Sequence, residues 1–164
     1  MFWGRYERSV DPKGRLALPS KLLESIPLQA DRSVFCLSRG HDQCLNMYTE
    51  REWNAVVKSL LEAAAAAPAE SVLIRNRLLS SSVNTVSVDA QARILLQPEI
   101  RKYAEIATDV VIIGNINVIE IWDKAKWDAF EAKHSKTFDQ IDNEIAKYMA
   151  ARVSSNPGPS NTTP

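Results

Sequence analysis

Residues 9–18 read Ser-Val-Asp-Pro-Lys-Gly-Arg-Leu-Ala-Leu, and residues 87–96 read Ser-Val-Asp-Ala-Gln-Ala-Arg-Ile-Leu-Leu. The two stretches agree at their Ser, Val, Asp and Arg positions, so the pattern Asp-x-x-x-Arg occurs twice. Recurrence of an ordered pattern along a chain is the signature of an internal repeat. The stretch therefore predicts two copies of one structural unit.

The similarity between the copies continues downstream in the same order. The matched pairs are Val34–Leu37 with Val110–Ile113, Leu45–Tyr48 with Ile119–Trp122, and Trp53 with Trp127. Generic β-hairpins can resemble one another by chance, but an ordered series of matches favours duplication.

Each copy is expected to begin with a strand, a tight turn and a return strand. In the first copy these are Arg5–Val10, Asp11–Gly14 and Arg15–Leu18, and the turn has the Asp, Pro and Gly preferences of type I. A short helix follows, with Pro19 or Pro98 near its first turn. Two apolar strands come next, at 33–38 and 44–48 in the first copy and at 109–113 and 118–122 in the second.

A helix is expected to end each copy. From Trp53 the apolar residues form a one-sided stripe that runs to Pro68, where the helix should stop. The second helix, 124–153, would be about 45 Å long, more than the roughly 30 Å breadth of a small domain. Either part of it packs on a neighbouring subunit or the helix breaks.

These elements predict a division into three parts. Residues 1–68 form the first repeat, residues 69–153 form the second, and residues 154–164 form a tail. The tail contains no apolar residue and is expected to be disordered.

Charge and hydropathy limit the classes of function. The 164 residues include 20 basic and 20 acidic side chains, so a general basic surface for nucleic acid is absent. A local basic patch remains within residues 1–21; it consists of Arg5, Arg8, Lys13, Arg15 and Lys21. We find neither a signal-peptide pattern nor an apolar run long enough for a membrane span, and expect a cytoplasmic protein.

The two cysteines are expected to be free thiols. Cys36 and Cys44 lack the CxxC spacing, and too few cysteines are present for a disulfide framework. His41 lies near them, but no second cluster completes the roughly four ligands of a zinc site. We predict no metal and no cofactor.

The Asp-x-x-x-Arg motif is the main candidate for function. Asp11 can cap the turn while Arg15 projects from the hairpin edge, and arginine suits bidentate recognition of guanine or phosphate. The alternative is a local ion pair that stabilises the turn, for which an exposed pair contributes about 0–1 kcal/mol. Arg75 and Arg77 could add phosphate contacts or be solvated surface charges.

The motifs together resemble those of the MraZ family. The segments that carry the resemblance are Met1–Tyr6, Asp11–Pro19, Asp89–Arg93 and Val118–Trp122. It covers roughly residues 1–130 and leaves the C-terminal helix and tail poorly constrained.

This resemblance implies an α+β fold of two AbrB-like swapped-hairpin β-barrel repeats with flanking helices and a long C-terminal helix. It also implies a nucleoid-associated transcriptional regulator that binds double-stranded DNA. Its targets would be short direct repeats in the promoter of the division and cell-wall gene cluster. The protein would be a ring-like homo-oligomer, with no membrane association and no small-molecule substrate.

The resemblance also implies which residues contact DNA. Carried over by position, they are Arg15 and Arg93, with Asp11 and Asp89 as structural partners and Gly14 in the turn. The basic neighbours Lys13, Arg5 and Arg8 complete the predicted interface. The second copy departs from the family pattern at Ala92 and Gln97, so its loop is expected to have a different turn and Arg93 is a less secure contact.

Two other classes of protein compete with this interpretation. An enzyme is disfavoured because no phosphate-binding glycine motif occurs and because His41 and His134 lack the partners that catalysis needs. An AbrB-like antitoxin would bind a partner protein through the C-terminal helix. The duplication argues against it, because such antitoxins usually carry one copy per chain.

Overall fold

The computed structural model describes residues 1–64 and 67–154, with side chains to Met149. Contacts divide the chain into two compact units, Met1–Trp127 and the residues from Asp128 onward. Within the described ranges, no helix combines the length and the apolar character needed to cross a bilayer.

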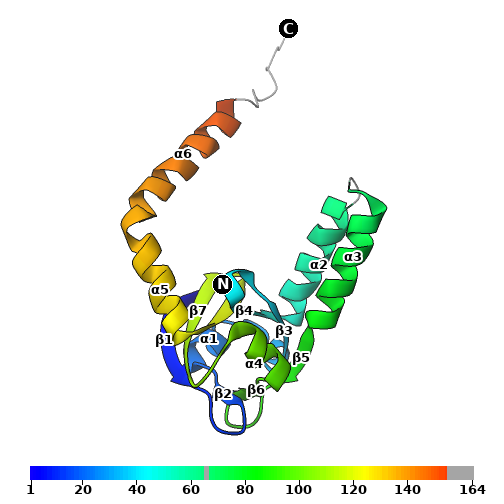
Figure 1. The fold of residues 1–164 in the computed structure, drawn as a ribbon, viewed down its shortest axis with the longest axis vertical. Helices are drawn as coiled ribbons and strands as arrows, with labels where there is room; N and C mark the ends of the chain where they lie inside the picture. Colours follow the sequence, from blue (N-terminus) through cyan, green and yellow to red (C-terminus); the bar gives the residue numbers. More distant parts are fainter. Residues whose placement is uncertain (65–66, 155–164) are drawn as a thin grey trace. The chain divides into compact units, whose positions relative to one another are not determined.

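A six-stranded antiparallel sheet is the centre of the first unit (Figure 1). Its strands, in spatial order, are β1 (Phe2–Ser9), β7 (Asp109–Ile116), β8 (Val118–Asp123), β4 (Leu45–Thr49), β3 (Val34–Arg39) and β5 (Asn84–Ser87). A second sheet consists of β2 (Arg15–Ala17) and β6 (Arg93–Leu95). The predicted strands of both copies are confirmed, with ends that shift by a few residues.

The first strand of each sequence repeat pairs with a strand of the other repeat. β1 of the first copy pairs with β7 of the second, and β5 of the second copy pairs with β3 of the first. The return strands β2 and β6 pair with each other, so that Leu16 lies opposite Ile94. Each copy therefore depends on the other for one edge of its sheet.

The hydrophobic core lies between these interleaved strands. Leu16 and Ile94, at equivalent positions in the two copies, are cross-strand partners and are fully buried. The other large, fully buried side chains include Leu22, Phe35, Leu37, Leu45, Met47, Leu96, Ile112, Ile119 and Ile121. Since both copies contribute, one shared core holds the return strands in place.

Short helices and turns connect the strands. They are α1 (Ser20–Glu24), η1 (Gln29–Arg32), η2 (His41–Gln43) and α4 (Pro98–Ala104). Pro98 occupies the first turn of α4, as predicted, while Pro19 is the residue before α1. Proline is tolerated at both places because the first N–H groups of a helix have no partner within it.

The longer helices differ from expectation at two points. α2 (Glu50–Ala64) begins three residues before the predicted start, because the Thr49 side chain accepts a hydrogen bond from Glu52 N and pairs with its carboxylate, as in a capping box. α3 (Ala69–Ser82) was not expected. Its apolar residues are spread around the helix, so the sequence lacks a one-sided stripe.

The C-terminal helix is broken. α5 (Lys124–His134) is followed by the 3₁₀ turn η3 (Ser135–Thr137) and by α6 (Phe138–Ser154). The Thr137 hydroxyl donates to His134 O at 2.9 Å, a local bond that competes with the helical pattern. Of the two predicted alternatives, the break is therefore present. The predicted tail beyond Ser154 lies outside the described residues.

Candidate nucleic-acid interface

The first Asp-x-x-x-Arg loop is organised around one carboxylate. Asp11 Oδ1 accepts from the backbone N–H groups of Lys13 and Arg15, both at 2.9 Å. Asp11 Oδ2 accepts from Arg15 Nε at 2.6 Å. Gly14 N donates to Asp11 O at 2.8 Å, and Gly14 has a φ of +82°. Asp11 thus stabilises the turn with one carboxylate oxygen and orients the Arg15 side chain with the other.

The second loop repeats this arrangement. Asp89 Oδ1 accepts from the N–H groups of Gln91 and Arg93 at 2.9 Å, and Oδ2 accepts from Arg93 Nε at 2.8 Å. Ala92 adopts a φ of +57° where the first copy has glycine. The expectation of a different turn is therefore wrong: the hydrogen bonds of the turn hold alanine in a left-handed conformation.

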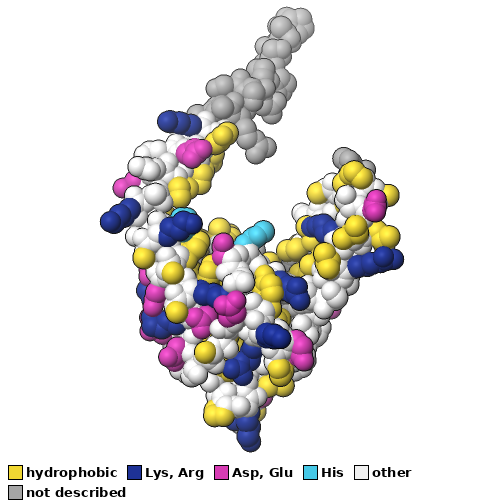
Figure 2. Space-filling model, viewed as in Figure 1, with side chains coloured by type: hydrophobic (Ala, Val, Ile, Leu, Met, Phe, Trp, Pro, Cys, Tyr) yellow, Lys and Arg dark blue, Asp and Glu magenta, His cyan; other side chains and the backbone are white. Residues whose placement is uncertain are grey.

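Backbone hydrogen bonds join the two loops. Leu96 N donates to Gly14 O at 2.9 Å, and Leu18 N donates to Ala92 O at 2.8 Å. The loops lie side by side at one end of the first unit (Figure 1). Figure 2 shows Lys or Arg side chains at the tip of that end. The paired return strands thereby bring both arginine-bearing loops into one surface.

The two arginines are partly exposed and are not equivalent. The exposed fraction of the side chain is 36% for Arg15 and 28% for Arg93. Both pair with the aspartate of their own loop, but Arg93 also donates from Nη2 to Gln91 Oε1 at 2.8 Å. The first copy has Lys13 at the position of Gln91, so Arg15 keeps more of its donors available for another molecule.

Hydrogen bonds favour the ionised form of both aspartates. Hydrogen bonds from the Arg15 backbone and side chain lower the pKa of Asp11 below its usual 3.8. The Arg93 side chain lowers the pKa of Asp89 in the same way. An ionised carboxylate offsets the charge of each arginine. The loops therefore do not form a surface of bare positive charge.

The other predicted basic residues divide between two places. Lys13 is exposed within the first loop. Arg5 and Arg8 lie on β1, where Arg5 pairs with the Glu7 carboxylate at 3.0 Å and Arg8 donates to Glu7 O at 2.8 Å. Arg8 also lines a groove with acidic Asp109. The structure thus brings Lys13 to the arginines of the motif, whereas Arg5 and Arg8 lie among acidic side chains.

Arg101 of α4 is a basic residue near the first loop that the sequence analysis missed. A Cβ atom placed on Gly14 would lie 3.7 Å from Arg101 Nη1. The Arg101 guanidinium also donates to Ala107 O at 2.8 Å. Comparison of the repeats could not identify it, because Leu23 occupies the equivalent position of the first copy.

Cys36 lies on β3 and Cys44 directly precedes β4, so neither cysteine belongs to these loops. Cys36 and Cys44 are free and buried, and burial raises the pKa of Cys44 to about 12. No group of three or more potential metal ligands occurs among residues 1–64 and 67–154.

Comparison with known proteins identifies the family. A family model described as "MraZ protein, putative antitoxin-like" matches residues 1–76 and 80–148. The chain is 33% identical to the "Transcriptional regulator MraZ" of Acetivibrio thermocellus, over 89% of this chain and 97% of that protein. It is also 33% identical to the protein of the same name from Heliobacterium modesticaldum, over 90% of this chain and 99% of that protein. The resemblance seen in the motifs is confirmed, and this chain belongs to the MraZ family.

Proposed function

We propose that the protein is a DNA-binding transcriptional regulator whose two Asp-x-x-x-Arg loops contact double-stranded DNA. The observation that carries the proposal is the pairing of the loops through Gly14 O and Ala92 O, which gathers both arginines at one end of the first unit. Relatives named as transcriptional regulators support the same role.

The aspartate contributes by fixing the arginine before DNA arrives. Arg15 is held at Nε by Asp11, so less side-chain freedom is lost on binding. The rest of its guanidinium is suited to the two acceptors of a guanine edge or to a phosphate, and a good bidentate contact with a base discriminates by about 1–3 kcal/mol. Because the Asp11 carboxylate offsets the positive charge of Arg15, binding depends more on the geometry of the arginine contact than on general attraction to the DNA phosphates.

A single pair of loops covers little DNA, and the chain has no net charge to add affinity. We therefore propose that several chains assemble as a ring-like homo-oligomer and bind short direct repeats together. The targets would lie in the promoter of the division and cell-wall gene cluster. Linked sites raise affinity through effective concentration without new contacts. Such a protein acts in the cytoplasm at the nucleoid and needs no cofactor, small-molecule substrate or catalysed reaction.

We also propose that residues 1–68 and 69–153 are AbrB-like swapped-hairpin repeats that close one barrel. The exchange of β1 and β5 between the copies supports this architecture. It explains why the two loops emerge together, since both follow directly from the exchanged strands.

The proposal is tested with Arg15→Ala in a fluorescence anisotropy titration of the promoter DNA that precedes the protein's own gene. Loss of the contact should weaken binding about tenfold to a hundredfold for each site engaged. Arg93→Ala should have a smaller effect, because Arg93 is already bound to Gln91. Arg51→Ala is the matched control: its side chain is 68% exposed and pairs with Asp31 rather than with either loop.

Light scattering should show the same mass for all three variants, which separates DNA contact from assembly. Binding of the wild-type protein should weaken steeply with salt concentration. Unchanged affinity of the Arg15 variant would remove the loops from the interface. Absence of DNA binding by the wild-type protein, with capture of a partner protein instead, would favour the antitoxin-like role.

A further inference from the structure

A groove beside α3 combines an apolar floor with basic edges. It has a volume of about 550 Å³ and is lined by Arg39, Ser71, Ile74, Arg75, Leu78, Leu79 and Ser82. Ile74 and Leu78, one helical turn apart, are 50% and 64% exposed. We call this feature the α3 groove.

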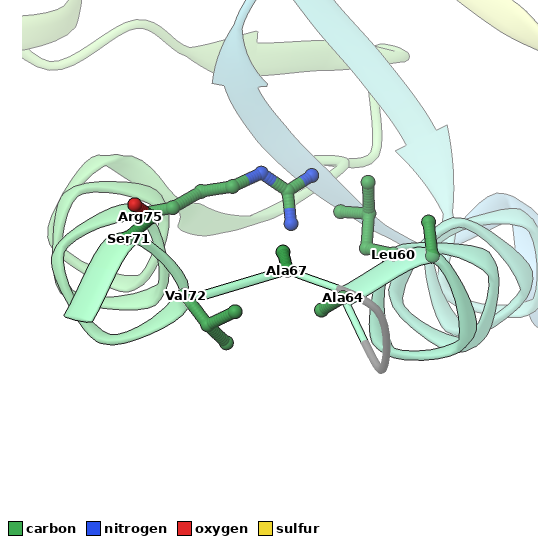
Figure 3. Close-up of a pocket in the computed structure, with 7 residues that line it drawn as sticks. Leu60, Ala64, Ala67, Ser71, Val72 and Arg75 are labelled. Carbon is green, nitrogen blue, oxygen red and sulfur yellow. The ribbon is translucent and has the colours of Figure 1, made fainter. Parts of the chain in front are cut away.

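The two arginines of the α3 groove favour an acidic partner. Arg39 lies over the Tyr103 ring at 4.8 Å, and the Tyr103 hydroxyl is in turn fixed by a bond of 2.9 Å to Gly40 O. Arg75 extends from α3 across the neighbouring space toward Leu60 of α2 (Figure 3). In the described part of the chain no carboxylate pairs with Arg75, so its charge lies on an apolar surface without an opposite charge.

α6 has the complementary pattern. Its apolar side chains Phe138, Ile141, Ile145 and Tyr148 are 46% to 69% exposed. Their spacing of three and four residues places them within an arc of about 80° on a helix of 3.6 residues per turn. Figure 2 shows hydrophobic side chains along one side of α6. Asp142 and Glu144 flank the arc on opposite sides. We call this feature the α6 stripe.

We propose that the α6 stripe of one chain docks into the α3 groove of a second copy of the chain. Apolar side chains would be buried against Ile74 and Leu78, while Asp142 and Glu144 would meet the charges of Arg39 and Arg75. Pairing of two α6 helices with each other is disfavoured, because these flanking acids would then face the same acids. Charge therefore favours docking of the α6 stripe into the α3 groove over pairing with the α6 stripe of another chain.

The contact joins two different surfaces, so each chain keeps one free groove and one free stripe for the next chain. Such head-to-tail contacts close into rings when the rotation between chains permits. This contact rests on the self-assembly proposed above and would be the interface that forms it. The loops that bear Arg15 and Arg93 take no part in the contact and stay available to DNA.

The test uses two full-length variants, each with one surface blocked. Ile74→Glu with Leu78→Glu blocks the α3 groove, and Ile141→Glu with Ile145→Glu blocks the α6 stripe. All four side chains are about half exposed or more, so folding should persist, which far-UV circular dichroism checks. Leu73→Glu, on α3 but outside the groove lining, is the matched control. Asn143→Glu, off the α6 stripe, is the second control.

Sedimentation velocity without DNA should show an assembly for the wild-type protein and both controls. Each blocked variant alone should sediment as a single chain of 18.3 kDa. An equimolar mixture of the two should give a two-chain particle and nothing larger, because it contains one intact groove and one intact stripe per pair. A monomeric wild-type protein, or a mixture that stays monomeric, would overturn the inference. So would a groove-blocked variant that assembles normally, as α6–α6 pairing predicts.

Charge reversal supplies a second test that leaves the apolar surfaces intact. Arg39→Glu with Arg75→Glu should reduce assembly, as should Asp142→Lys with Glu144→Lys. All four changes in one chain should restore it. Failure of restoration would contradict the assigned charge pairing. Arg15→Ala tests DNA contact while assembly stays unchanged, whereas the surface variants test assembly without DNA. Failure of the DNA proposal therefore shows in the binding titration, and failure of the docking proposal shows in sedimentation.

Discussion

Replacing Ala92 by glycine should stabilise the protein. Ala92 has a φ of +57°, which the hydrogen bonds of the second loop impose. A left-handed conformation costs a residue with a Cβ atom about 1–2 kcal/mol. Glycine removes this strain but loses more backbone freedom on folding, at a cost of about 0.5–1 kcal/mol. The difference between these terms predicts a net gain of about 0.5–1 kcal/mol for Ala92→Gly.

The reverse change in the first loop should be unfavourable. Gly14 has a φ of +82°, and a Cβ atom there would lie 3.0 Å from Leu96 O. Leu96 N donates to Gly14 O, so the crowded atoms belong to the backbone that joins the loops. Gly14→Ala should therefore destabilise the protein by about 1–2 kcal/mol, because close contact adds to the conformational strain.

Thermal unfolding monitored by circular dichroism measures both changes. For a chain of this size, the gain from Ala92→Gly should raise the midpoint by about 1–4 °C. Ala90→Gly is the matched control: Ala90 lies in the same loop without positive φ, so glycine should lower stability there by about 0.5–1 kcal/mol. A lower midpoint for Ala92→Gly, like that expected for Ala90→Gly, would show that Ala92 is not strained.

Three further measurements test the structure. The pKa values of Asp11 and Asp89 are lowered in the folded protein, so these carboxylates stabilise it fully above the usual pKa of 3.8 and lose that effect as pH falls through their folded pKa values. Below pH 4 the thermal midpoint of the variant with asparagine at both positions should therefore fall less than that of the wild-type protein. Cys44, with its pKa raised to about 12, should react with a thiol reagent at pH 8 only after denaturation, and rapid reaction in the folded protein would contradict its burial. Thr49→Ala should cost about 1 kcal/mol in urea unfolding through loss of the α2 cap, while Thr49→Ser should keep most of that stability.

Local chemistry was readable from the sequence. The Asp, Pro and Gly of the first turn predicted the hydrogen bonds that Asp11 makes, since these bonds involve residues within four positions. The Thr49-x-x-Glu52 pattern is also a signal for the observed start of α2, although the apolar stripe predicted a start three residues later. Helix α3 carried no comparable signal. Its polar and apolar residues are mixed around the axis, and its position beside β3 depends on tertiary contact.

The repeated Asp-x-x-x-Arg motif was enough to predict an aspartate-capped turn followed by an arginine at both places, because these contacts are local. The pairing of β1 with β7 and of β5 with β3 is visible only in the folded chain. Hydrophobic alternation indicates which face of a strand is buried. It does not indicate the neighbouring strand, because any apolar strand could form the same backbone hydrogen bonds. The shared burial of Leu16 and Ile94 selects one pairing, and that pairing places the two loops together.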